Sequence, residues 1–109
     1  MAWLVREGDV LATAEVAATR RARRRGLLGR DAFEGALVLR PCRAVHTVRM
    51  RFTIDVAFCD RDGIVLRTMC LRPWRVTPLV MASRMVIEAQ SGAFERWGLG
   101  VGDKLEVKE

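Results

Sequence analysis

An alternating segment near the middle of the chain constrains the fold more than any other feature. From residue 52 to residue 59, apolar side chains occupy the even-numbered positions, and smaller or polar residues occupy the odd-numbered ones. A period of two predicts a β-strand with one apolar face. A turn-forming segment, 60–63, and a second apolar segment, 64–71, follow directly. Together the three segments predict a β-hairpin.

Other apolar segments bounded by turn residues predict five more short strands. These are Trp3–Val5, Val10–Val16, Gly35–Leu39, Met85–Ala89 and Leu105–Val107. Two short helices are predicted, one from Arg20 to about Leu28 with Thr19 as its N-cap, and one over Ala93–Trp97. The segment 72–83 has no clear period and stays unassigned.

The order of these elements indicates the fold class. Strands and helices do not alternate regularly, which argues against a parallel doubly wound sheet. We therefore expect an α+β fold that is mostly β. In this fold a compact, curled antiparallel or mixed sheet forms a small barrel or sandwich and carries two short helices.

Length and composition set the remaining bounds. A chain of 109 residues, half of them hydrophobic and 29% charged, is typical of one globular domain, which we expect over residues 1–109. The longest uncharged stretch, Val76–Ser83, is eight residues, whereas a membrane span needs about 20. The first residues lack a basic segment followed by an apolar one, so no signal peptide is expected. The sequence thus predicts a soluble, cytoplasmic protein with no membrane contact.

The net charge of +6 suggests an anionic partner. Arginine supplies 17 of the 19 basic residues, and six of these arginines form the densest cluster: Arg20, Arg21, Arg23, Arg24, Arg25 and Arg30. One interpretation is a weak nucleic-acid binder that contacts phosphates through Arg20–Arg25. The other is a solvated helix face, because the cluster contains no aromatic residue on which a base could stack.

Three segments resemble the domain-of-unknown-function 192 family. Residues 23–30, RRRGLLGR, resemble its R-x-x-G-L-M-x-R signature, and residues 46–60, HTVRMRFTIDVAFCD, resemble its H-T-x-x-M-R-F-P-I-D-V-x-F-x-D segment. Glu88 with Gly92, and Gly98 with Gly102 and Asp103, match its closing motifs. The resemblance extends from about Ala12 to the C-terminus. It implies a compact, β-rich α+β domain, and it implies no reaction.

The candidate site rests on one histidine and two acids that lie within predicted strands. His46 is the only histidine, and it is therefore the side chain expected to titrate near neutral pH. We expect a non-enzymatic module that binds a ligand or partner in a cleft formed by His46, Thr47, Met50, Asp55 and Glu88. The alternative is a hydrolase-like enzyme in which His46 is a general base oriented by Asp55, with Glu88 as a further weak candidate. No serine or cysteine stands in a nucleophile-elbow motif.

The two strand acids also predict an internal ion-pair network. An acid on the inner face of a sheet is costly unless a cation pairs with it. We expect Arg23, Arg30 and Arg51 to pair with Asp55 and Glu88 and so to hold the first helix on the sheet.

The cysteines and the histidine do not predict a metal site. Cys42, Cys59 and Cys70 are widely spaced, which fits reduced, packed thiols rather than disulfides or zinc ligands. Cys42, His46 and Met50 are soft ligands at a spacing of four, which would suit Cu(I) on a helix. In an extended chain, however, residues four apart lie about 13 Å from each other. We therefore expect neither a metal nor a cofactor.

Overall fold

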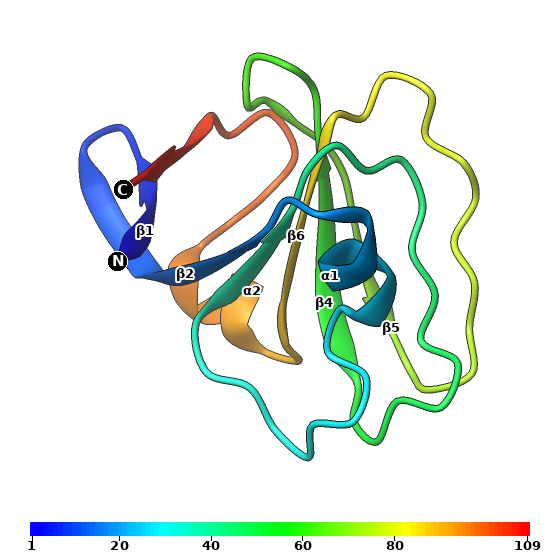
Figure 1. Cartoon of the computed structure of the whole chain (residues 1–109). Coiled ribbons are helices and arrows are strands. Elements are labelled where there is room, and N and C mark those ends of the chain that lie inside the picture. The colour runs from blue at the N-terminus through cyan, green and yellow to red at the C-terminus, as the bar shows by residue number, and fades with distance from the viewer.

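The computed structural model describes all 109 residues and joins seven strands into one curled sheet (Figure 1). The strands are β1 (Ala2–Arg6), β2 (Asp9–Ala17), β3 (Ala36–Leu39), β4 (Ile54–Cys59), β5 (Val65–Leu71), β6 (Met85–Gln90) and β7 (Leu105–Lys108). The helices are α1 (Arg20–Arg25) and α2 (Ala93–Trp97). The strand order is β5-β4-β6-β3-β2-β1-β7, and only β2 and β3 pair in parallel. The predicted fold class is confirmed. Neither helix has the length and apolar character needed to cross a membrane.

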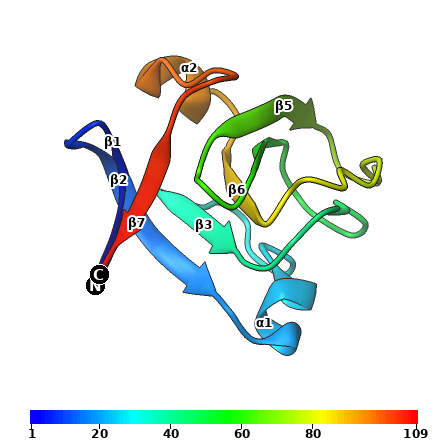
Figure 2. The ribbon, with the colours of Figure 1, turned by 90° about the horizontal axis from the view of Figure 1, so that it is seen from above.

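The sheet curls until its two edge strands meet at one end. Ile64, just before β5, forms an isolated bridge with Lys104, just before β7. The carbonyl oxygen of Gly63 accepts a hydrogen bond from the Leu105 amide at 2.8 Å. Gly63 has φ +85°, and a Cβ there would collide with the Leu105 carbonyl oxygen, so this junction requires glycine. Seen from above, the strands follow a curved path, with α1 and α2 on opposite sides (Figure 2).

The central strands β3, β4 and β6 are buried on both faces and separate two apolar cores. The α1-side core includes Leu27, Leu37, Val56, Phe58 and Val86. The α2-side core includes Val38, Ala57, Ile87, Phe94 and Leu105. Consecutive residues of each strand alternate between the two cores, as the pleat requires. The smaller residues at odd positions of β4 are therefore buried as well, because they face the α2-side core.

Helix α1 begins where the sequence predicts and ends earlier. The Thr19 hydroxyl oxygen accepts a hydrogen bond from the Ala22 amide at 3.0 Å, which confirms the predicted N-cap. The helix ends at Arg25 rather than near Leu28. The reason is Gly26, whose φ of +50° and ψ of −128° lie outside the helical region.

The unassigned segment 72–83 lies against residues 43–47, and two buried threonines hold the two segments together. The Thr47 hydroxyl donates to the Arg72 carbonyl at 2.6 Å and accepts from the Arg75 amide at 2.9 Å. The Thr77 hydroxyl oxygen accepts from the Val45 amide at 3.0 Å. These bonds fix the path of residues 42–50 across the sheet. The sequence could not reveal them, because the bonded residues lie far apart along the chain.

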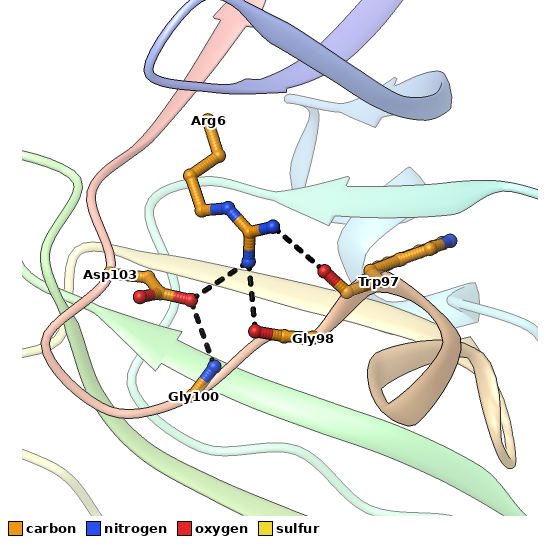
Figure 3. Close-up of polar contacts among 5 residues, drawn as sticks. All are labelled: Arg6, Trp97, Gly98, Gly100 and Asp103. Atoms are coloured by element: carbon orange, nitrogen blue, oxygen red, sulfur yellow. Dashed lines mark hydrogen bonds and ion pairs between the residues drawn. The ribbon is translucent and has the colours of Figure 1, made fainter.

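A polar network ties β1 to the connection between α2 and β7 (Figure 3). The Arg6 guanidinium donates to the carbonyl oxygens of Trp97 and Gly98, at 2.8 and 2.9 Å, and pairs with Asp103 at 3.1 Å. The same Asp103 oxygen, Oδ2, accepts a hydrogen bond from the Gly100 amide at 3.0 Å. The Asp103 carboxyl group therefore binds both the Arg6 side chain and the backbone of the turn at Gly100.

We expect Asp103→Ala to lower the free energy of unfolding by about 1–2 kcal/mol, because the variant loses one ion pair and one backbone bond, both only partly exposed to water. Urea unfolding measures the effect. Asp62→Ala is the matched control, since the Asp62 side chain is exposed and makes no hydrogen bond. Equal stability losses in the two variants would show that the network does not stabilise the fold.

Candidate functional site

A cavity of about 580 Å³ lies beside α1, and we call it the Glu88 cavity. Its walls come from α1 and the turn after it, from the segment 42–50, and from Leu39 and Glu88 of the sheet. It brings together three of the predicted site residues, His46, Met50 and Glu88, and four arginines of the predicted cluster. The volume lies within the range of about 300–1,000 Å³ that is typical of small-molecule sites.

Glu88 is a buried acid without a partner. On β6 it stands between Leu37 of β3 and Val56 of β4, both fully buried. The residue is 3% exposed, and no protein group donates a hydrogen bond to its buried Oε1. Burial disfavours the charged form and raises the pKa of the Glu88 carboxyl to about 7. A buried polar atom without a partner is rare in a folded protein and calls for a physical explanation.

Gly26 closes over the Glu88 carboxyl at the end of α1. A Cβ at this position would lie 3.4 Å from Glu88 Oε1, in direct contact with it. The left-handed φ of Gly26 strains any other residue as well. The backbone conformation, rather than the space beside the carboxyl, therefore favours glycine at this position of the RRRGLLGR segment.

Five arginines line the cavity, four from α1 and one from the segment 42–50: Arg20, Arg23, Arg24, Arg25 and Arg43. The half-buried Arg23 is already engaged, since its guanidinium donates to the carbonyl oxygens of Ala18 at 2.5 Å and Arg40 at 3.4 Å. The other four are exposed, and their guanidiniums form no hydrogen bond or ion pair within the chain. The mouth of the cavity therefore carries four positive charges that no protein group neutralises.

Cys42 also lines the cavity, although we expected it to be a packed thiol outside any site. Its thiol is half-buried and donates to the Ala44 carbonyl oxygen at 3.3 Å. Burial raises the pKa of the Cys42 thiol, the negative charge of Glu88 adds to this effect, and the Ala44 hydrogen bond and Arg23 oppose it. A thiol that stays protonated at neutral pH is a weak nucleophile.

The chain between Cys42 and Met50 is not extended as expected, and it turns so that Cys42, His46 and Met50 all line the cavity. Even so, no three His, Cys, Asp or Glu side chains are placed to hold a metal ion. His46 is exposed, and its Nδ1 accepts a hydrogen bond from the Val48 amide at 3.3 Å. Thr47 is fully buried and binds the segment 72–75 rather than the cavity.

The structure places Asp55 away from the other site residues. In the sheet Asp55 pairs with Ala89, and its neighbour Val56 pairs with Glu88. Paired residues point to the same face and consecutive residues to opposite faces, so Asp55 and Glu88 lie on opposite sides of the sheet. The predicted cleft of His46, Asp55 and Glu88 and the predicted His46–Asp55 pair are therefore not formed.

Asp55 instead caps α2. Its Oδ2 accepts hydrogen bonds from the amides of Gly92 at 3.0 Å and Phe94 at 3.1 Å. Two backbone donors at the start of the helix thus satisfy a strand acid for which we expected an arginine.

The predicted ion-pair network is also not formed. Arg30 pairs with Glu15 at 2.7 Å, and Arg51 pairs with Asp31 at 2.6 Å, both near the surface. Arg23 binds carbonyl oxygens, as described above. The carboxyl of Asp55 already accepts from two backbone donors, and Glu88, buried between Leu37 and Val56, forms no hydrogen bond or ion pair with any arginine of the cavity.

Solved structures with a similar fold are found by comparison. A protein of unknown function from Novosphingobium aromaticivorans matches 96% of this chain and 82% of its own, with a TM-score of 0.79 and 21% identity. A protein from Sinorhizobium meliloti, which carries the name of a proposed transcription regulator, matches 97% of this chain and 91% of its own, with a TM-score of 0.80 and 20% identity. At these identities the likeness concerns the fold alone.

Two sequence relatives from Pyrococcus match part of the chain. A UPF0127 protein of Pyrococcus abyssi is 37% identical over 62 residues, which is 57% of this chain and 53% of the relative. A UPF0127 protein of Pyrococcus furiosus is 33% identical over 63 residues, 58% of this chain and 54% of the relative. The match thus spans about half the length of each relative. Residues 3–107 match the profile of DUF192, described as an uncharacterized ACR, and the chain belongs to this family.

Proposed function

We propose that this protein is a non-enzymatic module that binds a small anionic ligand in the Glu88 cavity. One observation carries the proposal: a buried carboxyl group without a partner lies in a cavity whose mouth holds four unpaired arginines. Both features lower the stability of the folded chain, and a ligand that satisfies them removes this cost.

The arginines indicate the charge of the ligand. Clustered guanidiniums repel one another, and an anion that bridges them relieves this repulsion. Guanidinium groups also bind phosphate or carboxylate through paired, charge-assisted hydrogen bonds. An anion at the mouth of the cavity is therefore the ligand that these side chains suit best.

The chemistry of the cavity supports binding rather than catalysis. Burial raises the pKa of the Cys42 thiol and so favours its protonated form, and His46 forms no hydrogen bond or ion pair with a carboxylate. The nucleophile and the oriented base that hydrolysis by a side chain needs are therefore not assembled in this cavity.

We expect pyrophosphate to bind the protein, and we expect the double variant Arg24→Ala with Arg25→Ala to bind it at least tenfold more weakly, because two charge-assisted contacts are lost. Isothermal titration at low salt measures both affinities. Arg67→Ala is the matched control, since Arg67 is exposed on β5 and lies outside the cavity. No pyrophosphate binding, or an equal loss in the control, would overturn the proposal.

Nucleic acid is the competing anionic partner. The exposed arginines of α1 favour it, and one structural neighbour carries the name of a proposed regulator. Filter binding of a short DNA duplex at about 50 and 200 mM salt separates the two uses. A nucleic-acid site loses affinity steeply with salt, and pyrophosphate competes for it only at high concentration. Tight DNA binding that falls steeply with salt would show that the arginines bind a nucleic-acid backbone rather than a small anion.

A further inference from the structure

We propose that the ligand of the Glu88 cavity is a guanine nucleotide, whose base edge meets Glu88 and whose phosphates meet the arginines at the mouth. This inference rests on the proposed function and names the ligand class. It follows because one cavity contains both a buried carboxyl group that lacks hydrogen-bond donors and exposed arginines that lack a negatively charged partner.

The floor of the cavity requires donors that are neutral. No protein group donates a hydrogen bond to Glu88, whose Oε1 is buried beside Gly26, so the carboxylate lacks donors that a ligand can supply if the turn at Gly26 moves aside. A ligand ammonium would satisfy the carboxylate, but the arginines of the same cavity would repel it. The ligand must therefore present N–H groups without a positive charge.

Guanine meets this demand. Its N1–H and 2-amino groups lie side by side on one edge, and the two oxygens of a carboxylate accept from both at once. Hypoxanthine has the N1–H only, and adenine has neither the N1–H nor the 2-amino group. The three bases therefore form a series with two, one and no donors on this edge for Glu88.

The walls of the cavity suit a flat, weakly polar ring. Leu39, Val45 and Met50 line the cavity, and all three are buried. Aliphatic and methionine side chains pack against the faces of a ring without specific polar contacts. The volume of about 580 Å³ accommodates a base and its sugar.

The mouth suits the phosphates. Arg20, Arg24, Arg25 and Arg43 are exposed there and have no partner within the chain. Phosphate oxygens accept paired hydrogen bonds from guanidinium groups, and each contact is charge-assisted. A guanosine diphosphate thus carries neutral N–H donors for Glu88 at one end and negatively charged phosphates for the arginines at the other.

Isothermal titration of the full chain with GDP, IDP, ADP and pyrophosphate at pH 8 tests the inference. At this pH the Glu88 carboxyl is ionised, since burial raises its pKa to about 7. We expect GDP to bind at least tenfold more tightly than ADP, with IDP between them, because a site built for hydrogen bonds rejects an analogue that lacks the donors. We expect Glu88→Gln to remove this preference without weakening pyrophosphate binding. Glu106→Gln, an exposed substitution on β7, is the matched control and should keep the preference.

The possible failures are distinguishable. If GDP and ADP bind equally, or if Glu88→Gln keeps the preference for GDP, the ligand class is wrong while the anion site stands. If neither pyrophosphate nor GDP binds, the proposed function fails as well. The affinities of the unaltered protein for GDP, IDP and ADP separate these outcomes even if Glu88→Gln does not fold.

Discussion

Asp55→Ala should lower the free energy of unfolding by about 3–5 kcal/mol. The Asp55 carboxyl accepts hydrogen bonds from the amides of Gly92 and Phe94, and Phe94 is buried in the α2-side core. The variant leaves both donors without a partner, and each bond to a charged group contributes about 1.5–3 kcal/mol. The loss of the helix cap acts in the same direction. Urea unfolding followed by circular dichroism measures the change.

Two comparisons make this expectation specific to the cap. Asp31→Ala removes an aspartate whose side chain is 83% exposed and pairs only with Arg51, so it should cost less than about 1 kcal/mol. Asp55→Asn keeps one acceptor oxygen and should cost less than Asp55→Ala. Hydrogen exchange at the Phe94 amide should accelerate in both Asp55 variants. If Asp55→Ala were as mild as Asp31→Ala, the two hydrogen bonds would contribute nothing to stability.

Most of the fold could be predicted from the sequence, because its signals are local. The alternation in residues 52–59 and the turn that follows define β4 and β5, and Thr19 defines the start of α1. Such signals depend on neighbours along the chain, which the sequence displays directly. Segment 72–83 could not be assigned, since its conformation depends on bonds to Thr47 and Val45.

The candidate site was only partly predictable, because it depends on strand register. Asp55 and Glu88 both lie in correctly predicted strands, yet they face opposite sides of the sheet. A register shifted by one residue would have paired the two acids, since it moves every side chain of a strand to the other face. Nothing in the residues of β4 or β6 alone specifies that choice. The observed register gives each of the two cores its apolar side chains and leaves one acid on each side.

The cavity itself shows a related limit. The sequence shows the spacing of Cys42, His46 and Met50. We expected an extended chain there, in which these three side chains would lie too far apart to share a site. The turn that brings them to one cavity is fixed by long-range contacts, such as the hydrogen bond from the Ser83 hydroxyl to the Cys42 carbonyl oxygen at 2.8 Å. The arginine cluster was found because it is contiguous, while Arg43 joins it only in three dimensions.

Glu88→Gln should make the protein more stable, and the gain should depend on pH. Burial raises the pKa of the Glu88 carboxyl from the ordinary 4.5 to about 7. Between these values the folded chain binds a proton that the unfolded chain has released, so the stability of the unaltered protein falls as the pH rises. A shift from 4.5 to about 7 corresponds to roughly 3 kcal/mol at pH 8. Glutamine cannot ionise and avoids this loss.

The difference in unfolding free energy between Glu88→Gln and the unaltered protein should therefore be small at about pH 4.5, grow through about pH 5–7 and level off near roughly 3 kcal/mol at pH 8. Urea unfolding of both proteins across this range measures it, and subtraction cancels every pH effect that the two proteins share. Glu106→Gln should show no such growth, because Glu106 is exposed. A difference that stays constant with pH would mean that Glu88 ionises as readily in the folded chain as in the unfolded one. In that case hydrogen bonds from a ligand to this carboxyl would add no binding free energy. The proposal of a ligand that donates hydrogen bonds in the cavity would then be wrong.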